Sequence, residues 1–116
     1  MEYAHYRDMA AVLEEGRTDH PACFTYRQTL LRLGDVLFVP FPYEMFSEIT
    51  LRLRAYAPYR YVLGLSNANG YEAYLPTEDQ LCRGGYEVAC FLYSGAFTLT
   101  DNADQIIIDE NLKLLN

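Results

Sequence analysis

Residues 70–87, GYEAYLPTEDQLCRGGYE, contain many side chains that can do chemistry and few that can fill a core. Three of them are tyrosines, whose phenols can donate a hydrogen bond to a developing oxyanion or bind a metal that lowers their pKa. Gly84 and Gly85 stand directly before Tyr86 and indicate a special turn, which suits a phenol held at a fixed point. One tyrosine in a loop more often only packs its ring, so the interpretation depends on three occurring together.

Glu44, in the sequence VLFVPFPYE, is the second candidate for a functional side chain. The pattern predicts a strand, then a helix with Pro42 and Glu44 in its first turn. The helix dipole alone favours a carboxylate at such a position. At the junction of a strand and a helix, the same carboxylate can also face a cleft, where it would bind a metal or act as a base.

The histidines and cysteines form no recognisable site by their spacing. His5 and His20 share no ligand spacing, and we expect both to be solvated. Cys23, Cys82 and Cys90 are an odd number without a CxxC pair, which argues against a disulfide framework and a structural zinc site. We expect free thiols, with Cys82 exposed. The chain also lacks HExxH, P-loop, GxSxG and GxGxxG motifs.

Three helices are expected from apolar residues at helical spacing. They cover residues 3–15, a segment from Pro42 to the residues before Pro58, and residues 101–115, where the run QIII leaves a strand as an alternative.

Strands are expected where β-branched and aromatic residues form short runs. Residues 22–33 and 35–41 flank the turn signal Gly34-Asp35 and predict a hairpin, and two further strands are expected at 59–67 and 86–93. This order of elements predicts an α/β or α+β fold with a single mixed sheet flanked by about three helices. The length predicts one domain over residues 1–116. Glu44 and the tyrosine-rich loop would then lie beyond strand ends, where sites collect in such sheets.

Charge and hydropathy narrow the classes of function. The net charge of −7, without a dense basic cluster, argues against nucleic acid as a partner. The sequence has neither a run of eighteen apolar residues nor the basic start and apolar middle of a signal peptide. We therefore expect a soluble, cytoplasmic chain.

Three ordered motifs resemble a known family. The segment LRLGDVLFVPFPYEMFSEITLRLR, followed by YVLGLSNANGYEAYLPTEDQLCRGGYE, is similar to the later part of the catalytic domain of the neutral/alkaline, non-lysosomal ceramidases and their bacterial relatives. The resemblance covers roughly residues 30–90, and the ordered combination is more specific than any one motif. It implies a zinc-dependent amidase that cleaves the N-acyl bond of ceramide-like lipids. In the family, two histidines, a glutamate and a tyrosine hold the metal, with a water in the remaining position.

The resemblance assigns roles to individual residues. Glu44 in FPYE matches the ligand glutamate of the P-x-E motif, and Tyr74 in AYLPT best matches the ligand tyrosine. Tyr71 is the alternative ligand, because NANGYEAY can be aligned with a shift. Tyr86 in GGYE matches the tyrosine that helps to stabilise the oxyanion.

The chain departs from the family at the two histidine ligands. These come from upstream segments in the family, and the residues before Glu44 contain no recognisable histidine motif. Two protein ligands are too few to hold zinc at useful affinity, so we expect the chain alone to bind no zinc and to hydrolyse nothing. Two explanations stay open: a piece of a larger ceramidase-like protein that lacks an upstream segment, or a non-catalytic α/β module that binds a ligand or a protein. Self-association is expected in either case, because an unmatched half-site should leave apolar surface uncovered.

Overall fold

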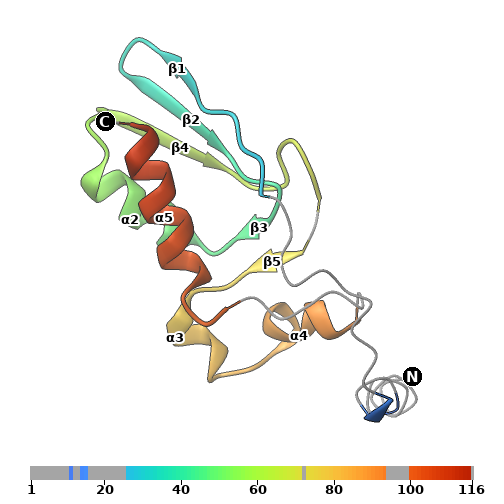
Figure 1. The fold of residues 1–116 in the computed structure, drawn as a ribbon. Helices are drawn as coiled ribbons and strands as arrows, with labels where there is room; N and C mark the ends of the chain where they lie inside the picture. Colours follow the sequence, from blue (N-terminus) through green and yellow to red (C-terminus); the bar gives the residue numbers. More distant parts are fainter. Residues whose placement is uncertain (1–10, 12–13, 16–25, 72, 94–99, 116) are drawn as a thin grey trace.

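The computed structural model describes residues 11, 14–15, 26–71, 73–93 and 100–115. They form a mixed sheet of three strands, a second sheet of two short strands, and four helices outside the N-terminal segment. This confirms the predicted α+β class with a mixed sheet (Figure 1). Apart from Ala11 and Glu14, which are helical, and Glu15, which lies in a turn, the residues of the helix expected at 3–15 lie outside the described residues. No helix in the described part of the chain is long and apolar enough to cross a membrane.

The larger sheet has the strand order β1 (Leu31–Leu33), β2 (Val36–Pro40), β4 (Tyr61–Leu65). Strands β1 and β2 are antiparallel and form the predicted hairpin, in which Gly34 takes a φ of 59° that glycine adopts without strain. Strand β4 pairs with β2 in parallel, as the intervening helix requires. The predicted hairpin and the predicted strand over 59–67 are therefore both confirmed.

The smaller sheet was not predicted. It consists of β3 (Glu44–Met45) and β5 (Tyr74–Leu75), which run parallel and pair Glu44 with Tyr74. The expectation that Pro42 and Glu44 lie in the first turn of a helix is wrong, because the chain stays extended there to pair with β5. The helix begins later, at Ser47.

Helix α2 (Ser47–Tyr56) ends before Pro58, as predicted, and α5 (Ala103–Leu114) confirms the predicted C-terminal helix. Between them along the chain come the single turn α3 (Glu78–Leu81) and α4 (Tyr86–Tyr93). The strand predicted at residues 86–93 is wrong. A short apolar run does not by its periodicity distinguish a strand from a packed helix, and here it forms a helix that packs beside β5.

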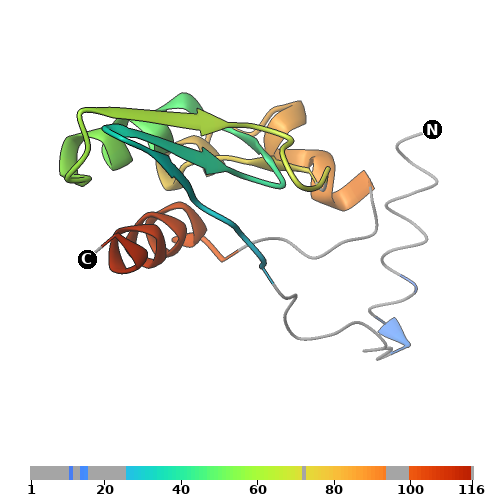
Figure 2. The ribbon, with the colours of Figure 1, turned by 90° about the horizontal axis from the view of Figure 1, so that it is seen from above.

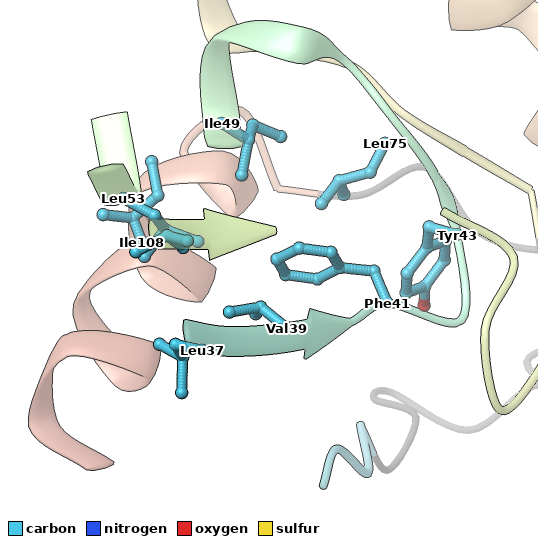
Figure 3. Close-up of a cluster of buried hydrophobic side chains, with 9 residues drawn as sticks. Leu37, Val39, Phe41, Tyr43, Ile49, Leu53, Leu75 and Ile108 are labelled. Carbon is cyan, nitrogen blue, oxygen red and sulfur yellow. The ribbon is translucent and has the colours of Figure 1, made fainter. Parts of the chain in front are cut away.

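The core lies between the larger sheet and two helices on one side of it (Figures 1 and 2). Strand residues alternate between the two faces of a sheet, and on the inner face the β2 and β4 side chains meet α2 and α5. Figure 3 shows this cluster, whose members are Leu37, Val39, Phe41, Tyr43, Ile49, Leu53, Val62, Leu75 and Ile108. The core thus fixes the strand ends from which the β3 and β5 segments leave.

Candidate functional site

Glu44 and Tyr74 lie side by side because β3 and β5 pair in parallel register. The backbone N–H of Glu44 donates to the carbonyl of Ala73 at 2.9 Å, and that of Phe46 donates to Leu75 at 3.2 Å. Side chains alternate between the two sides of an extended strand. Tyr43 is buried in the core, so the next side chain, Glu44, points away from the core. Both site side chains are half-buried. The Tyr74 hydroxyl faces the Glu44 carboxylate closely enough for a hydrogen bond from the phenol to contribute to its pKa.

This hydrogen bond raises the pKa of Tyr74 to about 12, from an ordinary value of 10.0. The bond to Glu44 is the largest cause, followed by partial burial of the phenol and then by the negative charges of Glu44 and Glu87. At neutral pH, Tyr74 is therefore protonated, and its proton is shared with a carboxylate.

Tyr86 contacts Tyr74 ring to ring. The ring centroids are 5.9 Å apart and the ring planes meet at 77°, an edge-to-face arrangement that aromatic pairs favour. Tyr86 is the first residue of α4, and the turn before it has φ angles of 65° at Gly84 and 106° at Gly85, a conformation that other residues rarely adopt. The glycine pair thus directs Tyr86 to Tyr74, and the Tyr86 side chain remains 66% exposed.

The structure brings together three of the four residues that the sequence singled out, and we call Glu44, Tyr74 and Tyr86 the EYY cluster. The fourth, Tyr71, lies in the loop before β5 and is 79% exposed. Of the two tyrosines considered as a ligand, Tyr74 is the one hydrogen-bonded to Glu44.

The loop after β4 holds the β3 segment in place. The backbone N–H of Met45 donates to Ser66 Oγ at 3.0 Å, and the N–H of Asn67 donates to the carbonyl of Tyr43 at 2.9 Å. Asn67 and Asn69 have φ angles of 53° and 64°, which asparagine tolerates better than most residues. Sequence reasoning did not single out Ser66, although the following asparagines and glycine signalled a special turn.

Glu87 is a further charged residue at the cluster that sequence reasoning assigned no role. It follows Tyr86 in the first turn of α4, where the helix dipole favours a carboxylate, and its charge contributes to the raised pKa of Tyr74. Its position in the GGYE motif was the available signal.

The donor atoms of the EYY cluster fit part of a zinc site. Glu44 and Tyr74 are register partners, so removal of the phenol proton of Tyr74 would leave two anionic groups beside each other. A tetrahedral zinc site needs more donors, and the described residues contain no group of three or more histidine, cysteine, aspartate or glutamate side chains able to hold a metal. His5 and His20 lie outside the described residues.

Cys82 and Cys90 are free, and Cys82 is exposed, as expected. Cys23 lies outside the described residues.

Comparison with known proteins gives no match: no protein-family model matches the chain, and no curated protein or solved structure matches it significantly. The ceramidase assignment therefore stays a prediction that rests on the ordered motifs.

Proposed function

We propose that this chain forms part of a zinc-dependent amidase of the ceramidase type, which hydrolyses the N-acyl bond of ceramide-like lipids. Glu44 and Tyr74 are two of the metal ligands, and Tyr86 donates to the oxyanion. One observation carries the proposal: the parallel register of β3 and β5, which places Tyr74 beside Glu44 so that the carboxylate raises the pKa of the phenol. It joins two residues that the motif resemblance had assigned to the same metal.

The bound metal would supply a Lewis acid for the amide carbonyl and lower the pKa of a water. The residues of the chain have distinct tasks around it. Glu44 provides a carboxylate oxygen, and Tyr74 provides a phenolate once it gives up the proton that Glu44 now holds by a hydrogen bond. Because that proton must leave, metal binding is linked to proton release.

Tyr86 donates its phenol proton in a hydrogen bond to the oxygen that becomes negative as the amide carbon turns tetrahedral. Its ring is fixed by the edge contact with Tyr74, while its exposed side chain can reach a substrate. A donor held in advance costs little reorganisation during the reaction, which is the property an oxyanion donor requires.

The two oxygen ligands do not complete the site. We propose that two histidines complete it, from a further segment or from a partner chain, and that without them the chain holds zinc only weakly and hydrolyses nothing.

Imidazole added in solution tests this assignment, since it can replace missing histidine side chains. Zinc affinity is measured by competition with a chromophoric chelator, with and without imidazole, for the wild type, Glu44→Gln, Tyr74→Phe and the matched control Tyr71→Phe. We expect weak binding that imidazole strengthens in the wild type and in Tyr71→Phe, and no such gain in the other two variants.

Three results would contradict the proposal. Equal imidazole-dependent binding by Glu44→Gln, Tyr74→Phe and the wild type would remove the metal from the EYY cluster, whereas loss in Tyr71→Phe alone would move the ligand to Tyr71. Tightly bound stoichiometric zinc, with turnover of a short-chain N-acyl sphingosine, would show that the site is complete without added donors.

A second candidate function is a non-catalytic α/β module that binds a partner through its surface. The observation that favours it is the exposed apolar face of the larger sheet, which includes Leu31, Leu33 and Leu63.

A further inference from the structure

The face of the larger sheet turned away from α2 and α5 is apolar throughout. We call it the outer sheet face; its members that are not fully buried are Leu31, Leu33, Val36, Phe38, Tyr61, Leu63 and Leu65. Pro40, the register partner of Leu65, shares this face but is buried. The strand register places them in rows across the three strands: Leu33, Val36 and Tyr61 form one row, and the next contains Leu31, Phe38 and Leu63. Alternation assigns these residues to one face, because the intervening Leu37, Val39 and Val62 are buried on the other.

Much of this face is accessible to solvent. The exposed fractions are 61% for Leu31, 71% for Leu33, 50% for Tyr61, 38% for Leu63 and 41% for Leu65. These fractions correspond to roughly 500 Å² of apolar surface, near the upper end for the largest patch on a monomer. Parallel strands such as β2 and β4 are normally covered on both faces, yet among the described elements the helices cover one face of this sheet.

We propose that the outer sheet face is the interface of a homodimer, in which two copies pack these faces together. Two patches of this size would bury on the order of 1,000 Å² in total, the lower bound for a specific protein interface. Face-to-face packing of two sheets about 10 Å apart is a common way to bury such side chains. Flat rows of leucine and tyrosine suit that arrangement.

The net charge of the chain indicates which partner covers the outer sheet face. Each copy carries a net charge of −7, which disfavours an anionic lipid surface. The seven side chains of the outer sheet face carry no charge, so the repulsion between two copies falls on the periphery, where salt screens it. One charge at the rim is that of Arg60, whose guanidinium carbon lies 5.2 Å from the centroid of the Tyr61 ring. A second copy of the chain can therefore cover the outer sheet face at a modest electrostatic cost.

This interface is separate from the EYY cluster, none of whose members lies on the outer sheet face. If the dimer does not form, the metal proposal still stands. If the metal proposal fails, the dimer proposal still stands.

Sedimentation velocity of the full chain over a range of concentrations tests the proposal, with the variant Leu31→Lys/Leu33→Lys. Both positions are exposed in the edge strand β1, where lysine is tolerated. The matched control is Leu51→Lys on α2, where the leucine is 55% exposed. We expect a concentration-dependent dimer whose dissociation constant rises at least tenfold in the double variant and stays unchanged in the control. Circular dichroism checks that each variant is folded, and the milder Leu33→Thr replaces the double variant if that one is not.

A wild type that remains monomeric at every concentration overturns the proposal, and so does a folded double variant that dimerises as the wild type does. Phosphatidylcholine vesicles distinguish another occupant. A monomer that co-sediments with these vesicles, and loses this property in the double variant, would assign the face to a lipid surface instead.

Discussion

Glu44 and Tyr74 are register partners in a parallel pair of strands only two residues long, and the carboxylate of Glu44 raises the pKa of the Tyr74 phenol. Such short strands contribute little pairing energy of their own. The contacts of Ser66 and Asn67 with the β3 segment, and the packing of α4 beside β5, hold the pair in register. The geometry of the EYY cluster is therefore a property of the surrounding loops as much as of the strands.

The hydrogen bond predicts how Tyr74 titrates in the metal-free chain. We expect its phenol to lose its proton near pH 12, and Glu44→Gln to lower this pKa because it removes the negative charge beside the phenol. A raised pKa means that the bond stabilises the fold below the ordinary value of 10.0, and that this contribution is lost as the pH rises to about 12. Ultraviolet difference titration of wild type against Tyr74→Phe measures the pKa. A value near 10 in the wild type would contradict the bond.

Contact between α2 and β4 predicts the effect of a methyl group at Gly64. A Cβ built there would lie 2.2 Å from Thr50 Oγ1 and 3.0 Å from Thr50 Cγ2, so Gly64→Ala forces the helix and strand apart. We expect a loss of about 1 to 3 kcal/mol in the free energy of unfolding, measured by urea denaturation. Thr50→Ala in the same chain removes Oγ1 and Cγ2, leaves Cβ at 3.1 Å, and should recover a large part of this loss. Additive effects of the two substitutions would contradict the contact.

How much of the fold could be predicted from the sequence depends on the length of each element. Helix α5 and the β1–β2 hairpin have periodic apolar residues or a clear turn signal, and both were predicted. Strands β3 and β5 have two residues each and so no periodicity, which is why Glu44 was assigned to a helix. In α4, the aromatic and β-branched composition favoured a strand, but the turn at the two preceding glycines and packing beside β5 determine a helix.

The structure brings the candidate residues together, although the elements that carry them were not predicted. Motif order singled out Glu44, Tyr74 and Tyr86, and the structure places them in one cluster. Their contact depends on strand pairing between segments far apart along the chain, which no local pattern encodes. Ser66 and Glu87 were missed for the same reason, since what they do follows from the elements packed beside them.

The ion pair between α2 and α5 predicts a cost for removing its cation. Arg52 Nη1 lies 2.6 Å from Oδ2 of Asp104, whose side chain is 3% exposed, and Arg52 also donates to Gln105. Arg52→Met leaves a buried carboxylate without its charged partner, so we expect a loss of about 2 to 4 kcal/mol in the free energy of unfolding. Arg52→Lys keeps the charge and should lose less.

Replacing both members of the pair is the informative control. Arg52→Met combined with Asp104→Leu removes the unpaired charge and should be more stable than Arg52→Met alone, as measured by thermal and urea denaturation. If the double variant were no more stable than the single one, the cost would lie in lost packing of the arginine stem.

The hydrogen bonds around Asp79 predict how the stability of the turn at α3 changes at acidic pH. Its hydroxyl donates to Asp79 Oδ1 at 2.7 Å, and Gln80 Nε2 donates to Oδ2 at 2.6 Å. These bonds, that of Thr77 first, hold the pKa of Asp79 below its ordinary value of 3.8. A lowered pKa means that the bonds stabilise the fold above the ordinary value, and that this contribution is lost as the pH falls through the lowered one.

Thr77→Val removes the hydroxyl at nearly constant volume, so we expect the pKa of Asp79 to rise toward 3.8 and the pH dependence of the melting temperature below about pH 4 to weaken. Thr77→Ser keeps the donor and should behave as the wild type. Carboxyl carbon NMR titration of Asp79 gives the pKa directly. Thr77 is buried, and its side chain makes no capping hydrogen bond to the backbone of α3. An unchanged pKa of Asp79 in Thr77→Val would therefore show that the Thr77 hydroxyl does not set the charge of Asp79.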